Sequence, residues 1–253
     1  MDNEIKGNVL APLKQEKRVD ENEIVELGAD ELGKNEQTKQ ISLAWELLVD
    51  QMPELKDVKL RILKKRQIKD VRFTRGTYIF PVKEEDPLEI QLLLSNDDVL
   101  DLMDEEERAV VRQHAKKIGL KDEQLEGALL RVFIFAHEAG HVVDFVKNYL
   151  NNFDYQGMAR SEVVEIWREE YRANMNMLAV PNMTRPKFEA FLAAATEVEV
   201  DEFLDNYGFD SIKEFKMEQQ KSYRQLPHES YADDFAIKFI KKNAAKFGLV
   251  FAE

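Results

Sequence analysis

The chain has 253 residues, a formal net charge of −13 from 36 basic and 49 acidic residues, and no cysteine. This length is sufficient to bury a hydrophobic core without disulfides. The acidic balance argues against nucleic acid as a partner, because phosphate contacts need clustered Lys and Arg. The absence of cysteine excludes a thiol nucleophile, a disulfide scaffold and a cysteine-ligated metal site, and it favours a cytoplasmic location.

Neither export nor membrane insertion is expected from the apolar segments. The first twenty residues carry scattered charges and lack the apolar stretch of a signal peptide. The longest apolar segment, residues 128–136, is interrupted by Arg131 and is too short to span a bilayer. We therefore expect a soluble protein with no membrane partner.

The first half of the chain changes character twice. Residues 1–38 are polar and charged, which predicts a flexible N-terminal arm. From Ile41 to Leu48 the apolar residues have helical period, and Pro53 follows as a stop. A domain is therefore predicted over residues 39–253.

Alternating apolar and polar residues between 58 and 95 predict strands. The alternation covers residues 58–63, 71–74, 77–80 and 88–94, with a turn at Arg75 and Gly76. The polar members of 88–94 fit a strand with one solvated face, at the edge of the sheet. The prediction is a small, mostly antiparallel sheet.

After Ser95 the patterns are helical, so the expected fold class is α+β. Further helices are predicted at about 161–179, 185–197, 200–207, 211–225 and 227–246. The helix that carries residues 137–141 is apolar on almost every side, which predicts that it is buried at the centre of the domain. Ala139 and Gly140 are small enough to let another backbone pass close to it.

Residues 137–141 read His-Glu-Ala-Gly-His. On a helix, positions i and i+4 share one face, so His137 and His141 can direct their imidazoles at one point, as zinc ligands do. Glu138 is displaced by about 100° around the same turn, which suits a general base acting on a metal-bound water better than a third ligand. The cofactor predicted from this spacing is Zn²⁺.

A catalytic zinc needs a third protein ligand, and histidine is scarce in this chain. Two helical carboxylates compete for the position, Glu229 and Glu170. Glu229 is favoured because Asp233 stands one turn further on the same helix face. A metal-bound histidine normally donates its second ring N–H to a carboxylate, and Asp233 could accept it. Glu170 remains the alternative third ligand.

The segments His137-Glu-Ala-Gly-His141 and Glu229-Ser-Tyr-Ala-Asp233 together resemble the gluzincin arrangement, an HExxH helix followed by an ExxAD-type glutamate helix. Minigluzincins and ImmA/IrrE-type peptidases are similar in having a short sheet ahead of the active-site helix. The resemblance covers about residues 58–245 and implies a zincin-like fold. It further implies that Glu229 is the third zinc ligand, Asp233 orients a histidine ligand and Glu138 activates water.

Two departures from this family stand out. The gap between His141 and Glu229 is longer than in compact members, so residues 150–226 are interpreted as a helical insertion. Glu170 matches the compact ImmA/IrrE spacing better than Glu229 does. No motif identifies the transition-state donor, and proximity to the motif makes four residues candidates: Tyr231, Tyr223, Tyr171 and His228.

The function expected from this resemblance is that of a soluble zinc metalloendopeptidase that hydrolyses peptide bonds in an intracellular protein. Glu138 would take the proton of the zinc-bound water. An extended peptide substrate would bind by strand addition to residues 88–94. The alternative is a catalytically inactive binding or regulatory protein on a zincin scaffold.

Overall fold

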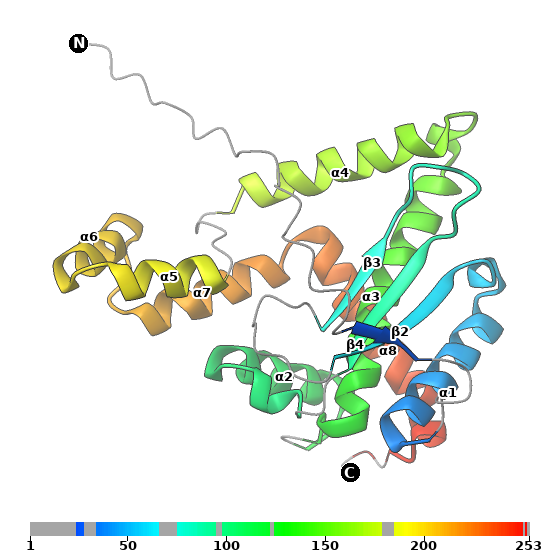
Figure 1. The fold of residues 1–253 in the computed structure, drawn as a ribbon, viewed down its shortest axis with the longest axis horizontal. Coiled ribbons are helices and arrows are strands. Elements are labelled where there is room, and N and C mark those ends of the chain that lie inside the picture. Colours follow the sequence, from blue (N-terminus) through cyan, green and yellow to red (C-terminus); the bar gives the residue numbers. More distant parts are fainter. Residues whose placement is uncertain are drawn as a thin grey trace.

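The computed structural model describes most of the chain: residues 24–27, 34–65, 75–94, 98–121, 124–178, 185–249 and 251. These residues form an α+β fold in which a small mixed sheet is accompanied by mostly helical structure (Figure 1). None of the described helices is both long and apolar enough to cross a membrane.

The sheet has the strand order β1-β2-β4-β3, from the strands β1 (Ile24–Glu26), β2 (Lys59–Lys65), β3 (Gly76–Ile79) and β4 (Glu89–Leu94). The outer pairs, β1 with β2 and β3 with β4, are antiparallel, while the central pair β2 and β4 is parallel. The sheet is therefore mixed. The strand predicted at 71–74 lies outside the described residues.

The prediction of an edge strand at 88–94 is wrong. β4 lies between β2 and β3 and is hydrogen-bonded to both. Ile90 and Leu92 are almost completely buried, which is why a strand with polar members can still be central. A peptide cannot add to β4, because its backbone is already paired on both sides. Among the described strands, the edge next to the histidine helix is β3.

The N-terminal arm predicted over residues 1–38 is interrupted by ordered elements. Ile24–Glu26 pairs with β2, and α1 (Glu36–Gln51) begins before residue 38. Asn35 and Thr38 form a capping box that satisfies the first backbone N–H groups of α1. The domain boundary predicted at residue 38 therefore falls within α1, and β1 belongs to the sheet of the domain. Residues 1–23 and 28–33 lie outside the described part of the chain.

The remaining helices follow the predicted pattern closely: α2 (Glu105–Ile118), α3 (Gly127–Phe145), α4 (Arg160–Asn176), α5 (Arg185–Ala194), α6 (Glu197–Tyr207), α7 (Ile212–Arg224) and α8 (Pro227–Asn243). Pro227 occupies the first turn of α8, where its missing N–H costs nothing. Helices α4, α7 and α8 lie within three residues of the predicted bounds, whereas α6 begins after its N-cap Thr196, inside the helix predicted at 185–197.

Helix α3 lies at the centre of the domain, between the sheet and α8 (Figure 1). Its buried residues include Phe135, Ala139 and Val142, each with no exposed surface. At Gly140 a Cβ atom would lie 2.8 Å from the Cα of Ala232 on α8. The predicted close approach of a second backbone is confirmed. The two helices and the side chains between them are called the α3–α8 seam below.

The helical segment 150–226 has two parts with different partners. α4 packs Val163, Val164 and Trp167 into the main core. Helices α5, α6 and α7 share a smaller core of Phe188, Leu204 and Phe215. Figure 1 shows these three helices to one side of the rest, and they are called the α5–α7 lobe below. That the segment is an insertion into a smaller domain stays a prediction.

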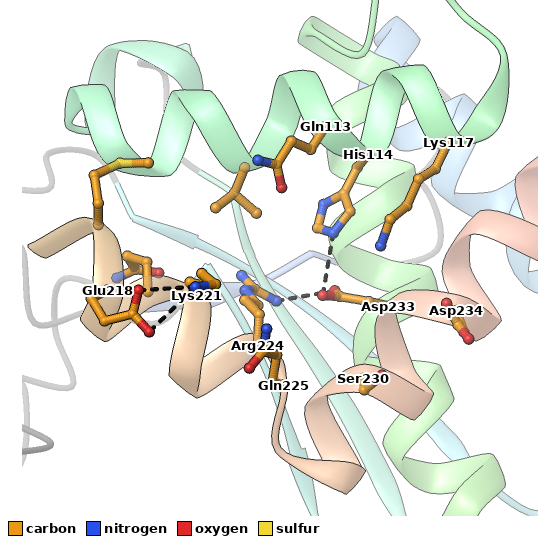
Figure 2. Close-up of a pocket in the computed structure, with 13 residues that line it drawn as sticks. Gln113, His114, Lys117, Glu218, Lys221, Arg224, Gln225, Ser230, Asp233 and Asp234 are labelled. Carbon is orange, nitrogen blue, oxygen red and sulfur yellow. Dashed lines mark hydrogen bonds and ion pairs between the residues drawn. The ribbon is translucent and has the colours of Figure 1, made fainter. Parts of the chain in front are cut away.

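A pocket of about 410 Å³ opens where the lobe meets the rest of the domain (Figure 2). It lies between α2, α7 and α8, and its lining includes His114, Arg224 and Asp233. The pocket therefore reaches one of the residues singled out from the sequence.

Candidate metal centre

The three predicted metal ligands meet at the α3–α8 seam. Each of the three residues offers one ligand atom, a ring nitrogen or a carboxylate oxygen, and these three atoms lie within 4.8 Å of one another. His137 Nε2 lies 3.2 Å from His141 Nε2 and 3.3 Å from Glu229 Oε2. His141 Nε2 lies 3.7 Å from Glu229 Oε1. These three residues could hold a metal ion.

The spacing of these atoms can be compared with a zinc site. Zinc binds nitrogen and oxygen ligands at about 2.0–2.1 Å in a tetrahedron, which places neighbouring ligand atoms about 3.3–3.4 Å apart. The two Nε2 atoms are 3.2 Å apart, and His137 Nε2 is 3.3 Å from Glu229 Oε2, both close to that value. The 3.7 Å separation from His141 Nε2 is to the other carboxylate oxygen, Oε1. The donor set of two imidazoles and one carboxylate is also a common one for catalytic zinc. The residues therefore fit the group that the sequence implies.

The local structure explains why these three side chains converge. One helical turn separates His137 from His141, so their rings lie on one face of α3. Gly140, on the same side, lets α8 approach closely enough for the carboxylate of Glu229 to reach both rings. Glu229 lies in the first turn of α8, where the helix dipole favours a negative charge.

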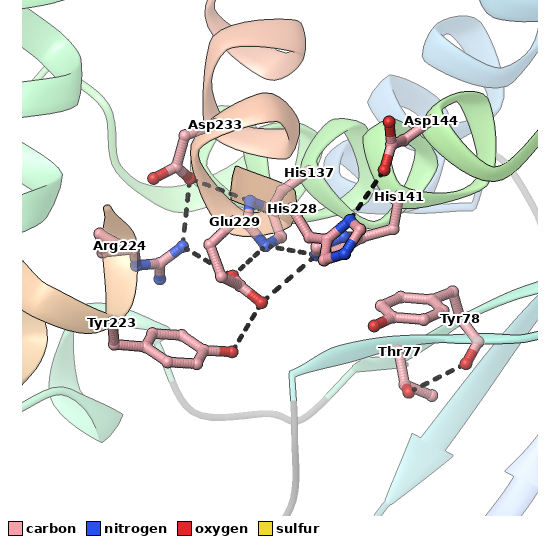
Figure 3. Close-up of polar contacts among 10 residues, drawn as sticks. All are labelled: Thr77, Tyr78, His137, His141, Asp144, Tyr223, Arg224, His228, Glu229 and Asp233. Carbon is pink, nitrogen blue, oxygen red and sulfur yellow. Dashed lines mark hydrogen bonds and ion pairs between the residues drawn. The ribbon is translucent and has the colours of Figure 1, made fainter. Parts of the chain in front are cut away.

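Asp233 lies one turn beyond Glu229 and contacts the outer nitrogen of a ligand histidine. Its Oδ1 atom is 2.9 Å from His137 Nδ1 (Figure 3). In the tautomer that leaves His137 Nε2 free for a metal, Nδ1–H donates this hydrogen bond. Arg224 Nη1 donates to the same oxygen at 3.1 Å. Asp233 thus occupies the position predicted for the residue that orients a ligand.

The two histidines have opposite pKa shifts. Burial alone would lower the pKa of His137, but its hydrogen bonds with Asp233 and Glu229 outweigh burial and raise the pKa to about 9. Burial and the neighbouring His137 lower the pKa of His141 to about 3. In the metal-free protein at neutral pH, His141 is therefore neutral and offers a lone pair at Nε2, whereas a metal must displace a proton from His137.

The two glutamates of the site also differ. Burial would raise the pKa of Glu229, but the hydrogen bond from His137 and the charges of both histidines lower it to about 2. Burial raises the pKa of Glu138 to about 7, against the opposing effect of His137. Glu229 is thus a permanent carboxylate, and Glu138 can gain or lose a proton near neutral pH.

Strand β3 packs directly against Glu138. A Cβ atom at Gly76 would lie 2.7 Å from Glu138 Cγ and 3.0 Å from Ile134 Cγ2. A larger residue here would force Glu138 or Ile134 to shift, so Gly76 lets the edge strand reach the acidic side chain next to the ligands. The sequence turn placed at this glycine is in fact the first residue of β3.

Two tyrosines border the candidate ligands. Tyr223, at the end of α7, donates a hydrogen bond of 2.8 Å to Glu229 Oε1. Tyr78, on β3, holds its ring centroid 4.5 Å from that of His141. Figure 3 shows the Tyr78 hydroxyl directed from the sheet toward the space between His141 and Tyr223. Burial, chiefly, raises the pKa of Tyr78 far above its usual range, so this phenol stays protonated.

Three other candidates from the sequence have different surroundings. Glu170 does not belong to the ligand group, and its carboxylate accepts a hydrogen bond from the Tyr149 hydroxyl. His228 Nδ1 pairs with Asp144 Oδ2 at 3.0 Å. Tyr231 packs against the main core and lies about 200° around α8 from Glu229. The structure therefore does not favour Glu170 as third ligand or Tyr231 as donor.

Arg224, Tyr78 and His114 surround the site without having been singled out as site residues. Arg224 and His114 come from helices α7 and α2, which contain no motif connecting them to residues 137–141. For Tyr78 a weak signal was present, because the alternation of 77–80 places it on the same strand face as buried Phe80. Sequence spacing could not reveal which helix this face would meet.

Comparison with known proteins identifies no relative of this chain. No family, no curated protein and no solved structure matches the chain. The functional argument therefore rests on the motif, the geometry and the electrostatics of the site.

Proposed function

We propose that the protein is a zinc-dependent metallopeptidase that hydrolyses peptide bonds in an intracellular protein substrate. One observation supports the proposal: His137, His141 and Glu229 bring one ligand atom each to within 4.8 Å of one another, beside Glu138. Bound there, Zn²⁺ would polarise the scissile carbonyl and lower the pKa of a water molecule. The other steps are carried by side chains of this chain.

Glu138 is the general base in this mechanism. Its place on α3, next to His137 and against β3, puts a carboxylate beside the three ligands. With a pKa raised to about 7, it can accept the proton of the attacking water and return it to the leaving amine nitrogen. The contact with Gly76 fixes the side chain from the sheet side and limits its rotation.

Strand β3 is the proposed docking edge for the substrate. It ends the sheet among the described strands, so one side of its backbone is free to pair with an extended peptide. Because Gly76 of this strand touches Glu138, a peptide on its edge would pass close to the base. This role replaces the one that the sequence suggested for residues 88–94.

Tyr78 is the proposed hydrogen-bond donor to the carbonyl oxygen as negative charge develops on it. Its phenol is neutral and lies on the docking strand against His141. The hydroxyl proton of Tyr223 is engaged with Glu229, which leaves Tyr223 better suited to orienting that ligand. Removal of one such donor typically costs a factor of about 10²–10³ in kcat.

The first test is the zinc content of the purified parent, Glu229→Ala and the matched control Glu170→Ala. We expect near one zinc per chain in the parent and the control, and a large loss in Glu229→Ala, because two ligands remain. Zinc retained in Glu229→Ala but lost in Glu170→Ala would move the third ligand to α4. Absence of zinc from the reconstituted parent would refute the metallopeptidase.

The second test measures turnover on a peptide library read by mass spectrometry. Glu138→Gln should abolish cleavage while leaving zinc bound, because the amide cannot take a proton. Tyr78→Phe should keep zinc and lower kcat with little change in KM. A parent that binds zinc and cleaves nothing, in the library or in a lysate of unfolded proteins, would support the inactive binding protein instead.

A further inference from the structure

His114, on α2, contacts the carboxylate that holds His137. Its Nε2 atom lies 3.2 Å from Asp233 Oδ2, and the two residues are 4 % and 5 % exposed. The imidazole stacks on Phe133 with a centroid distance of 4.8 Å and an interplanar angle of 26°. A buried, stacked ring can turn little, so the direction of its Nε2–H is fixed by α2 and α3 together.

The two oxygens of Asp233 have separate partners. Oδ1 faces His137 Nδ1 and Arg224 Nη1, and Oδ2 faces His114 Nε2. A carboxylate held at both oxygens cannot rotate about its last bond without breaking a hydrogen bond. Held at Oδ1 alone, the carboxylate could turn about that bond and weaken its contact with the imidazole of His137.

We infer that His114 is a positioning residue for His137, acting through Asp233. The inference rests on the proposed function, since it treats His137 as a metal ligand. By donating to Oδ2, His114 sets the plane of the carboxylate so that Oδ1 meets His137 Nδ1. This contact holds the His137 ring in the orientation in which Nε2 faces His141 and Glu229.

Arg224 cannot take over this role. Its Nη1 donates to the same oxygen as His137, and its side chain is 33 % exposed, while that of His114 is 6 % exposed. Figure 2 shows His114 and Arg224 approaching Asp233 from opposite helices across the pocket. The arginine neutralises the carboxylate, and the histidine determines its direction.

The variants are chosen to separate hydrogen bonding from packing. His114→Phe keeps an aromatic ring against Phe133 and removes the donor. His114→Gln can place an amide N–H near the position of Nε2. A smaller residue is avoided, because the adjoining pocket would let water replace the lost donor. Gln113→Ala, which alters a neighbouring residue that lines the same pocket, is the control.

The main readout is the dissociation constant for zinc, measured by competition with a chelator on folded protein. Loss of a residue that orients a ligand typically weakens metal binding about 10–100-fold. We expect about tenfold weaker binding for His114→Phe and parent-like binding, within about threefold, for His114→Gln and Gln113→Ala. The visible spectrum of the Co²⁺-loaded protein should shift in His114→Phe alone.

A metal-free readout separates this inference from the proposed function. The chain has 4 histidines, so ¹⁵N-histidine NMR can resolve the hydrogen-bonded Nδ1 proton of His137. It should exchange faster with water in His114→Phe than in the parent or in His114→Gln. A parent that binds no metal would defeat the metallopeptidase, while this comparison would still decide the role of His114.

Unchanged zinc binding and unchanged proton exchange in folded His114→Phe would overturn the inference. If that variant does not fold, His114→Met replaces it, because methionine has a similar volume and no N–H donor. Equal behaviour of the Met and Gln variants would then overturn the inference, and selective loss in the Met variant would support it.

Discussion

The α3–α8 seam and the α5–α7 lobe are both built from helices around an apolar core, but they bury different things. The seam buries polar side chains, among them His141, Glu229 and Asp233, each at most 5 % exposed. The buried core of the lobe consists of Phe188, Leu204 and Phe215. Burying a polar group costs free energy unless it has a hydrogen-bond partner. The seam therefore requires well-defined side-chain positions, whereas the lobe requires only apolar side chains.

The lobe reaches the candidate site through the last turn of α7. Tyr223 and Arg224 extend from it to Glu229 and Asp233. A further link to the domain is exposed, an ion pair of 2.9 Å between Lys213 and Glu105 of α2. We therefore expect that a change in the core of the lobe leaves the candidate ligands in place, whereas a change in the seam displaces them.

The largest expected effect separates the two regions. Phe215→Ala empties the centre of the lobe, where Phe215 has no exposed surface. We expect a loss of about 3–5 kcal/mol in the stability of the lobe, from lost burial and the cavity left behind. Hydrogen exchange of α5 and α6 amides should accelerate, while zinc affinity changes less than about threefold. A tenfold loss of zinc affinity would show that lobe and seam form one cooperative unit.

In the metal-free protein, a falling pH should destabilise the seam before it destabilises the lobe. The folded-state pKa of Glu229 is about 2, below its ordinary 4.5. The contribution of the ionised carboxylate to the stability of the fold is therefore fully present above pH 4.5. It is lost as the pH falls from 4.5 toward 2, on the order of 3 kcal/mol in total. The difference in unfolding free energy between the parent and Glu229→Gln should shrink across this window. A constant difference would contradict the depressed pKa.

Gly140→Ala tests the closest contact of the seam. In an ordinary helix this change stabilises by about 0.5–1 kcal/mol. Here the new methyl would meet the Ala232 backbone, so we expect a loss of about 1–3 kcal/mol and weaker zinc binding. Urea denaturation and chelator competition measure the two effects. Ala193→Val, at an exposed position of α5, is the control; it should leave zinc binding unchanged and lower stability by only about 0.5 kcal/mol, from the lower helix propensity of valine. Stabilisation by Gly140→Ala would mean that α8 can move away freely.

The smallest effect is expected where the lobe touches α2. Lys213 and Glu105 form an ion pair with side chains 61 % and 71 % exposed, and solvent screens such pairs strongly. Lys213→Ala should leave the unfolding midpoint and zinc affinity unchanged within error. A clear drop in the midpoint would show that this contact orders the lobe.

Local patterns were sufficient to predict the helices and the pair of histidines on α3. The spacing of His137 and His141, the small size of Gly140 and the proline at the start of α8 all act within one or two helical turns. Periodicity determines which residues share a helix face, whatever the rest of the chain does. These predictions agree with the structure for that reason.

Strand order and the choice between two glutamates depended on the tertiary structure. Alternation shows which residues of 88–94 share a face, but not whether a neighbour covers the strand on one side or on both. Glu170 and Glu229 both follow plausible spacings, and the approach of α8 to Gly140 brings only Glu229 into the ligand group.

By itself, the sequence determined two imidazoles on one helix face, an adjacent carboxylate, a carboxylate pair one turn apart on a later helix, and a chain without thiol chemistry. The tertiary structure decided which elements surround them. It brings Tyr78 from the sheet, Arg224 from the lobe and His114 from α2 to the same few side chains. Side-chain period is a local property of the backbone, whereas contacts between distant segments depend on how whole faces pack together.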